Sequence, residues 1–96
     1  MKLFPFKIFK VKGKSMFPSL KPGDFVIVLR TKKVKIGDII VVSHPFNRNK
    51  VIIKRVSKLS GDKLFLIGDN FSKSTDSRDF GEVGLSEVIG RVLFVI

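Results

Sequence analysis

Gly-Asp dipeptides divide this chain into short apolar runs. They stand at residues 23–24, 37–38, 61–62 and 68–69, and Gly-Asp is a dipeptide typical of turns. The runs around them are short and rich in Val, Ile and Phe: FKIFKV, FVIVL, DIIVVS, VIIKRV, KLFLI and VIGRVLFVI. No stretch has a convincing 3.6-residue apolar period. The pattern predicts an all-β domain of about six strands, either a small barrel or packed sheets.

Length and residue types narrow the possibilities further. At 96 residues, residues 1–96 are expected to form one domain with a small core. Only the stretch 84–89 is expected to hold a helical turn. The chain has no cysteine and a single histidine, His44, so no metal site and no cofactor are expected. No segment approaches the ~18 apolar residues of a membrane span, which predicts a cytoplasmic location.

The N-terminal stretch MKLFPFKIFKVKGK mixes lysines with Phe, Leu and Ile. It lacks the continuous apolar run of a secretory signal. Two interpretations fit it: peripheral contact with an anionic membrane surface, or an edge strand with solvated lysines. The pattern favours the edge strand.

The net charge of +11 is distributed unevenly. Residues 1–60 hold fifteen Lys and Arg against two acids, whereas residues 61–96 hold four against six. A basic half of this kind indicates an anionic partner such as nucleic acid, a membrane surface or an acidic protein, or only a soluble lysine-rich surface. Charge alone does not separate these interpretations.

One lysine stands in an unusual position. In VIIKRV, side chains alternate across the predicted strand, so Ile52, Lys54 and Val56 share one face. Lys54 therefore lies between apolar neighbours, where desolvation favours the neutral amine. A neutral lysine can act as a general base. The alternative is an edge lysine whose amine reaches water.

Two further segments carry candidate chemistry. Ser15 in GKSMFPSL is either part of a surface turn or a nucleophile at a strand end. The stretch GDNFSKSTDSRDFG at 68–81 is dense in hydrogen-bonding side chains. In it, Asp76 and Arg78 can form an ion pair, and a serine can orient a neutral lysine. Composition by itself is also that of a long polar hairpin loop.

Together these segments resemble the type I signal peptidase family of Ser/Lys endopeptidases. The matching motifs are SMFPSL with the upstream Gly13, GDFVIV, GDIIVV, IIKRV, GDN…STDSRDFG and VIGRV, in the family's order over nearly the whole chain. The resemblance implies that Ser15 is the nucleophile, that Lys54 is the general base and that Ser74 orients this lysine. It also implies an oxyanion bond from the backbone N–H of Ser15. Structural support of the site falls to Gly13, Asp69, Asn70, Asp76 and Arg78. Gly13 stands where some members carry a hydroxyl that also donates to the oxyanion.

Compared with the family pattern, neither the usual N-terminal membrane anchor nor the inserted second β-domain is expected here. The resemblance therefore implies a soluble, minimal protease that removes an N-terminal leader from a protein or peptide. The string SHPF…KVIIKRV…GDN…DSRDFG is similar to short relatives that mature nickel-containing superoxide dismutase. The expected walls of the substrate site are the strand from Phe25 to Leu29 and the strand before Lys54, with Met16 and Phe17 at a pocket or in the core.

Three other classes compete with this interpretation. A nucleic-acid-binding β-barrel would use the basic half with Phe side chains as stacking platforms, but most Phe residues lie in apolar runs, so no nucleic-acid partner is expected. A self-cleaving Ser/Lys repressor domain would need an upstream DNA-binding domain and a cleavage loop. An inactive peptidase-like scaffold would not need both Ser15 and Lys54.

Overall fold

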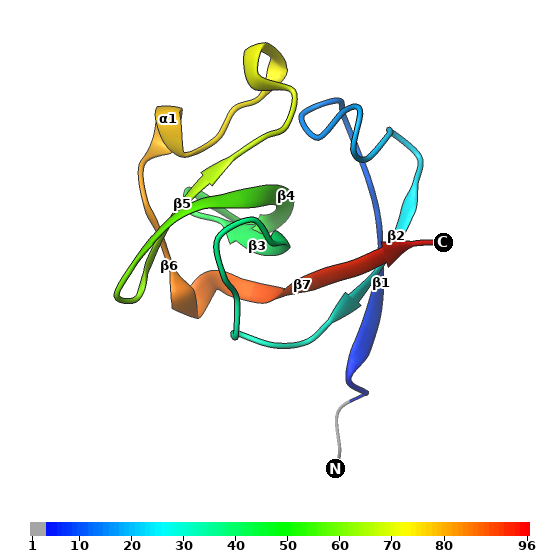
Figure 1. Ribbon diagram of the computed structural model, residues 1–96, viewed down its shortest axis with the longest axis horizontal. Helices are drawn as coiled ribbons and strands as arrows, with labels where there is room; N and C mark the ends of the chain where they lie inside the picture. Colours follow the sequence, from blue (N-terminus) through cyan, green and yellow to red (C-terminus); the bar gives the residue numbers. More distant parts are fainter. Residues whose placement is uncertain (1–3) are drawn as a thin grey trace.

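The computed structural model describes residues 4–96 and is all-β. Seven antiparallel strands form one sheet in the order β1-β2-β7-β3-β4-β5-β6 (Figure 1). The strands are β1 (Phe6–Lys10), β2 (Phe25–Leu29), β3 (Ile39–His44), β4 (Asn47–Ser60), β5 (Lys63–Ile67), β6 (Val83–Gly84) and β7 (Val88–Val95). All six predicted strands are confirmed, and the seventh, β6, has only two residues. The sheet coils on itself without closing, because β1 and β6 are its two edges.

The long strand β4 changes neighbours along its length. Its first part pairs with β3, and from Arg55 onward it also pairs with β5. Among the described residues, 51–54 therefore pair with β3 on one side and with no strand on the other. β4 passes directly into β5 through a turn at Gly61, so the predicted core without an inserted second domain is confirmed.

Two apolar clusters form the core. The first lies among β3, β4, β5, β6 and β7 and comprises Ile40, Val42, Val56, Leu64, Leu66, Val83 and Val88. The second lies beneath β1 and β2 and comprises Val11, Met16, Leu20, Val26, Val28 and Val41. Three of its members come from the loop after β1, so this loop is anchored by burial rather than by strand pairing.

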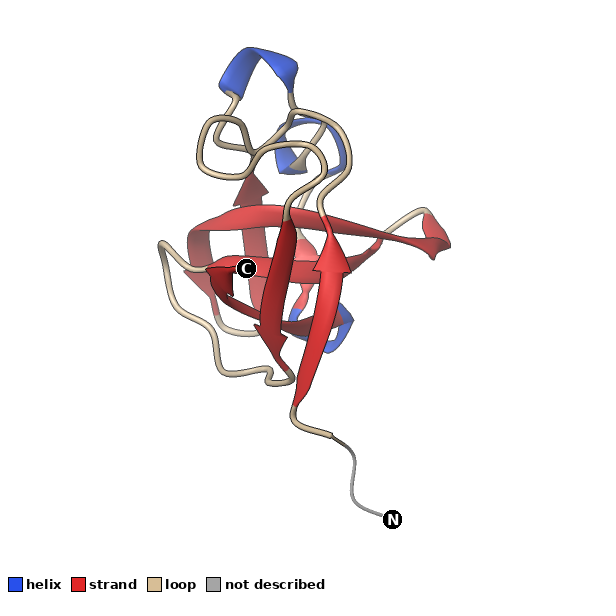
Figure 2. Ribbon diagram, turned by 90° about the vertical axis from the view of Figure 1, so that its right-hand side faces the viewer, coloured by secondary structure: helices blue, strands red, loops and turns tan. Residues whose placement is uncertain are grey.

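The polar stretch after β5 is more ordered than a hairpin loop. It contains a 3-10 turn η1 (Phe71–Lys73) and a short helix α1 (Ser77–Phe80). Asp76 and Asp79 form a capping box at the start of α1, a motif that satisfies two free backbone N–H groups. The helical turn expected within 84–89 is confirmed as η2 (Leu85–Glu87). The loop after β1 and the stretch after β5 meet at one end of the molecule (Figures 1 and 2).

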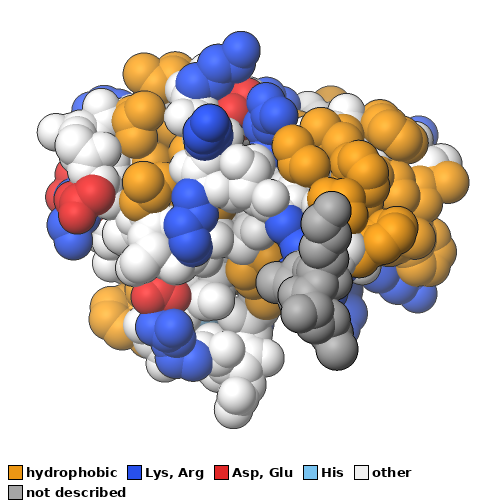
Figure 3. Space-filling view, turned by 90° about the horizontal axis from the view of Figure 1, so that it is seen from below, with side chains coloured by type: hydrophobic (Ala, Val, Ile, Leu, Met, Phe, Trp, Pro, Cys, Tyr) orange, Lys and Arg blue, Asp and Glu red, His pale blue; other side chains and the backbone are white. Residues whose placement is uncertain are grey.

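The outer face of β1, β2 and the end of β7 is apolar and exposed. Strand register places Ile8 and Phe94 on either side of Ile27, on the same face. We call this surface the apolar face; it comprises Phe4, Phe6, Ile8, Phe25, Phe94 and Ile96, each at least 42% exposed. It forms a continuous patch in Figure 3. The predicted edge strand is confirmed for residues 6–10, while residues 1–3 lie outside the described part.

Candidate active site

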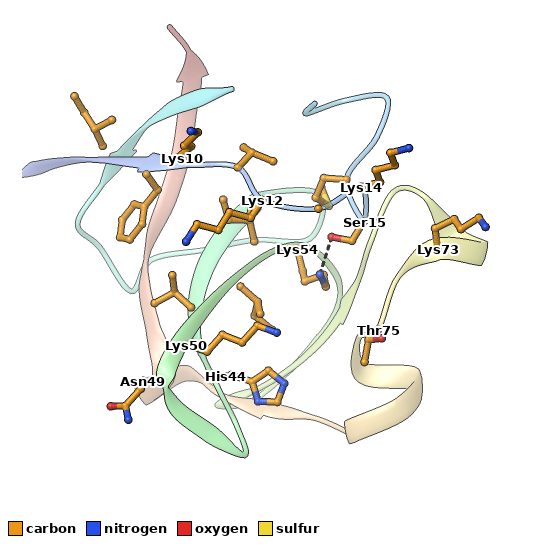
Figure 4. A pocket seen from close by; sticks show the side chains of 18 residues that line it. Lys10, Lys12, Lys14, Ser15, His44, Asn49, Lys50, Lys54, Lys73 and Thr75 are labelled. Atoms are coloured by element: carbon orange, nitrogen blue, oxygen red, sulfur yellow. Dashed lines mark hydrogen bonds between the residues drawn. The ribbon is translucent and has the colours of Figure 1, made fainter. Parts of the chain in front are cut away.

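Ser15 and Lys54 meet although 39 positions separate them in the chain. The Lys54 Nζ donates a hydrogen bond of 2.8 Å to Ser15 Oγ (Figure 4). Ser15 lies in the loop between β1 and β2, and Lys54 lies on β4 just before the pairing with β5 begins. The two side chains that the sequence singled out are therefore in direct contact.

The position of Ser15 follows from the residues beside it. Met16 and Leu20 are 1% and 2% exposed and belong to the core cluster beneath β1 and β2. A hydrogen bond from Leu20 N to Met16 O closes the turn between them. Gly13 has a φ of +71°, a left-handed conformation that favours glycine. Burial after Ser15 and a tight turn before it thus hold the serine at the surface of the core.

Lys54 is buried, with only 5% of its surface exposed. Ile40 is its cross-strand partner on β3. Desolvation by burial lowers the pKa of Lys54 below its ordinary value; the Asp76 charge opposes this effect and the Lys50 charge adds to it. The core-facing orientation predicted from strand alternation is confirmed.

The Gly-Asp-Asn turn after β5 contacts the loop that carries Ser15 at several points. Asn70 N donates to Ser15 O at 2.8 Å, and Asn70 Nδ2 donates to Lys14 O at 3.0 Å. Asp69 N lies 3.4 Å from Met16 Sδ. Gly68 is packed so closely that a Cβ there would lie 2.6 Å from Ser15 O. Each residue of this turn therefore touches the backbone or side chains around Ser15.

The side chain of Arg55, next to Lys54, points away from the core and binds Asp69 of the Gly-Asp-Asn turn. Its guanidinium donates two hydrogen bonds to Asp69, at 2.8 and 2.7 Å. These bonds from Arg55 lower the pKa of the Asp69 carboxyl, and Ser19 Oγ donates to it as well. Two parallel hydrogen bonds from a guanidinium fix the orientation of a carboxylate. Asp69 therefore links Arg55 on β4 to Ser19 in the loop that carries Ser15.

Asp76 is a fully buried carboxylate that gathers donors from several directions. Oδ2 accepts from Gly68 N and Ser74 Oγ, each at 2.8 Å. Arg78 Nε donates to Oδ1 at 2.9 Å, so the predicted ion pair is present. Burial alone would raise the pKa of Asp76, but the hydrogen bonds from Arg78, Gly68 and Ser74 outweigh it and hold this pKa far below its ordinary value. The carboxylate therefore stays ionised at neutral pH.

A groove of about 860 Å³ opens beside the Ser15–Lys54 pair. One wall is the end of β1 with the residues leading to Ser15, and the other is the unpaired side of β4 at residues 49–54; Lys73 and Thr75 lie at one end (Figure 4). The expected wall at Phe25–Leu29 is wrong, because β2 lies behind β1 and does not line the groove. Met16 lines the groove and is buried. Phe17 is 44% exposed and does not line the groove.

Comparison with known proteins agrees with this geometry. The family model described as "Signal peptidase, peptidase S26" matches residues 1–64 and 57–96. The chain belongs to the S26 signal peptidase family. It is 31% identical to the mitochondrial ATP-independent inner membrane protease subunit 1a of Arabidopsis thaliana, with 86% of the chain and 66% of that protein aligned. It is 34% identical to the mitochondrial inner membrane protease subunit 2 of Danio rerio, over 91% of the chain and 62% of that protein. Signal peptidase I of Bacillus caldolyticus is 27% identical over 98% of the chain and 81% of its own length.

The S26 chain thus spans less than two thirds of the length of the two mitochondrial relatives. Within residues 4–96, no helix is long and apolar enough to cross a bilayer. The fold and family agree with the resemblance seen in the sequence.

The expected contact between Ser74 and Lys54 differs in the structure. Ser74 and Lys54 are both described, and no hydrogen bond joins them. The Ser74 hydroxyl donates to Asp76 instead, because this buried carboxylate is the strongest acceptor within its reach. Ser74 is connected to Ser15 through Gly68, whose α-carbon lies between them: a Cβ there would be 2.1 Å from Ser74 Oγ.

Sequence reasoning missed two positions near the pair. The sequence indicates Gly68 only as part of a Gly-Asp turn, whereas its close packing on Ser15 leaves no room for a side chain. The sequence pattern assigns no role to Arg55, which forms an ion pair with Asp69. The adjacent Lys-Arg of β4 beside a distant Gly-Asp was the available signal.

Proposed function

We propose that this chain is a serine endopeptidase in which Ser15 is the nucleophile and Lys54 is the general base. The observation that carries this proposal is the 2.8 Å contact between Lys54 Nζ and Ser15 Oγ, with the amine buried. Family membership supports it. Residues 1–96 act as one catalytic domain in this proposal.

The chemistry needs no group beyond the chain and water. Neutral Lys54 takes the proton of Ser15 Oγ, and the oxygen bonds to a peptide carbonyl carbon. The backbone N–H of Ser15 donates to the oxyanion that forms; Gly13 offers no side-chain donor. The C–N bond breaks, and Lys54 returns the proton to the departing amine. Water then gives a proton to Lys54 and attacks the ester carbonyl carbon. The ester C–O bond breaks, Lys54 returns that proton to Ser15 Oγ, and the acyl product leaves as a carboxylic acid.

The substrate in this proposal is an extended leader segment lying in the groove. An extended peptide can add to the unpaired side of β4 at residues 49–54, where backbone groups lack a neighbouring strand. From the sequence resemblance, the narrower candidate substrate is the N-terminal pro-segment of a nickel-containing superoxide dismutase precursor.

Cleavage of a diverse peptide library near pH 8, read by mass spectrometry, tests the proposal. Wild type is compared with Ser15→Ala and Lys54→Ala, and we expect the wild-type cuts to vanish in both variants. A superoxide dismutase precursor in the mixture tests the narrower substrate. Cuts that persist in Ser15→Ala contradict the assignment. Absence of cuts in wild type, together with salt-sensitive nucleic-acid binding, favours the binding-module class instead.

The apolar face supports peripheral membrane contact as a second part of the proposal. Lys7 and Lys10 lie on β1, the strand that contributes Phe6 and Ile8 to this face. Apolar side chains beside lysines fit the boundary of an anionic bilayer. Co-sedimentation with phosphatidylglycerol vesicles is expected for wild type and reduced for Phe6→Ser with Phe94→Ser. Equal sedimentation of both proteins contradicts the contact; the predicted cytoplasmic location stays a prediction that cell fractionation tests.

A further inference from the structure

Lysines dominate the groove beside the Ser15–Lys54 pair. Besides Lys54, its lining includes Lys12, Lys14, Lys50 and Lys73, all exposed, and Lys10, whose amine lies over the Phe25 ring. None of the 18 lining residues is Asp or Glu. The local field in the groove is therefore strongly positive.

Within residues 4–96, the basic side chains that have carboxylate partners all lie outside the groove. Three arginines have carboxylate partners: Arg48 with Glu87, Arg55 with Asp69 and Arg78 with Asp76. Among residues 4–96, no ion pair includes a groove lysine. Like charges gathered in one groove repel each other, and an anionic occupant relieves this repulsion.

The spacing of these lysines matches an extended chain. Lys50 precedes Lys54 by four residues on the same face of β4, about 13 Å at 3.3 Å per residue. Lys12 precedes Ser15 by three residues that include the tight turn at Gly13, so the two lie at most about 10 Å apart along the chain. Lys12 and Lys50 extend from opposite walls on the same side of the Ser15–Lys54 pair, and Lys73 lies on the other side (Figure 4).

We propose that the groove selects leader peptides that carry acidic side chains three to four residues from the scissile bond, where they meet Lys12 and Lys50. This inference rests on the proposed function and adds the substrate class. A peptide fits these observations better than a nucleic acid does. Base stacking needs exposed aromatic rings, and Phe9, the only Phe that lines the groove, is half-buried in the core.

The test compares peptides that differ by one charge. A peptide cut by wild type is prepared with Glu or Gln at each of the five positions on either side of the cut. The ratio of kcat/KM for Glu over Gln is measured at about 20 mM salt. An exposed ion pair is worth about a 1.5- to 5-fold ratio, so we expect this gain at the third or fourth position on one side. At 1 M salt, where the screening length is about 3 Å, the ratio falls to about one.

Variants assign the effect to the groove. Lys50→Gln removes the gain at its position, and Lys50→Glu makes a Lys-bearing peptide the better substrate. Lys63→Gln, an exposed lysine on β5 outside the groove, is the matched control and keeps the wild-type ratio. Because Lys50 also lowers the pKa of Lys54, rates change for every peptide, but the Glu-to-Gln ratio cancels this common change.

Binding separates this inference from the proposed function. Fluorescence anisotropy of labelled Glu and Gln peptides on Ser15→Ala requires no cleavage and is expected to give the same preference. Tighter binding of Glu peptides than of Gln peptides, without cleavage by wild type, supports the inferred acidic preference of the groove but contradicts the proposed protease activity. Ratios of one in both measurements at low salt, or a preference unchanged in Lys50→Gln with Lys12→Gln, overturn the inference.

Discussion

Replacing Gly68 with alanine tests whether close packing behind Ser15 sets the geometry of the pair. Gly68 is buried between the Ser15 carbonyl and the Ser74 side chain. A Cβ at this position would lie 2.6 Å from Ser15 O and 2.5 Å from Ser74 Cβ. Neither neighbour is the free end of a long side chain, so the backbone on at least one side must move.

The expected magnitudes follow from these distances. Restoring a contact of about 3.0 to 3.4 Å requires a shift of roughly 0.4 to 0.8 Å between Gly68 and Ser15. Overpacking of a buried site costs about 1–3 kcal/mol. In a domain of this size, 1 kcal/mol corresponds to about 4–8 °C in Tm. Since a misplacement of about 1 Å costs about 100-fold in rate, a shift of roughly 0.4 to 0.8 Å is expected to lower kcat/KM by about 6- to 40-fold.

Two other glycines supply matched controls. A Cβ at Gly84 would meet only Ser86 Oγ, at 3.5 Å, so Gly84→Ala is expected to leave stability and rate near wild type. A Cβ at Gly90 would lie 2.3 Å from Leu29 O, away from the groove. Gly90→Ala therefore lowers Tm by overpacking without displacing Ser15.

The assays are thermal unfolding by circular dichroism and kcat/KM on one cleaved peptide, at a temperature where every variant is folded. We expect a lowered Tm for Gly68→Ala and Gly90→Ala, and a lowered kcat/KM for Gly68→Ala alone. An unchanged Tm in Gly68→Ala would falsify the close approach. An equal loss of rate in Gly68→Ala and Gly90→Ala would show that the effect acts through stability and not through Ser15.

Three further predictions concern the charged groups. Because the neutral form of Lys54 is the proposed base, kcat/KM is expected to rise with pH through the lowered pKa of Lys54. The free energy of unfolding is also expected to rise with pH between this folded-state pKa and about 10.4, the ordinary value for lysine. Denaturant titrations over this pH range should show no rise in unfolding free energy for Lys54→Met. Asp76→Asn is expected to cost about 3 kcal/mol in unfolding free energy at pH 7. Since folding lowers the pKa of Asp76 far below its ordinary value, the wild-type advantage is full above about pH 3.9 and declines as pH falls towards the folded pKa. Urea unfolding should therefore show a smaller difference between wild type and Asp76→Asn at pH 2 than at pH 7. Arg55→Gln removes a partly exposed pair with Asp69 and is expected to cost at most about 1 kcal/mol, measured by the same unfolding; a loss above 2 kcal/mol would contradict that limit.

The strands and the orientation of Lys54 were predictable because both follow from local pattern. Gly-Asp turns and Val-, Ile- and Phe-rich runs gave all six longer strands, and a period of two gave the buried side of β4. The bounds of β4 were harder to predict. The strand runs from Asn47 to Ser60, well beyond its apolar centre VIIKRV, because pairing with β3 and β5 extends it through polar residues.

Other features depend on contacts between distant segments, which no local pattern records. The need for glycine at position 68 arises from Ser15, 53 positions earlier, and not from its own φ. The α1 helix has only four residues, and its start depends on the buried Asp76. The substrate wall was misplaced because no local pattern shows that the end of β1, rather than β2, lies across the groove from β4.

Asp76 explains how a buried lysine beside a carboxylate can lose its proton. A direct ion pair with Asp76 would hold Lys54 in its charged form, and the Asp76 charge does raise the pKa of Lys54. Both Asp76 oxygens, however, accept hydrogen bonds from Arg78, and Oδ2 also accepts from Gly68 and Ser74. Asp76 shares its charge with Arg78, and desolvation remains the largest influence on the pKa of the Lys54 amine. The same carboxylate accepts a hydrogen bond from Gly68, which packs against Ser15. One buried group thus contacts the glycine behind the serine and opposes the desolvation that lowers the pKa of Lys54.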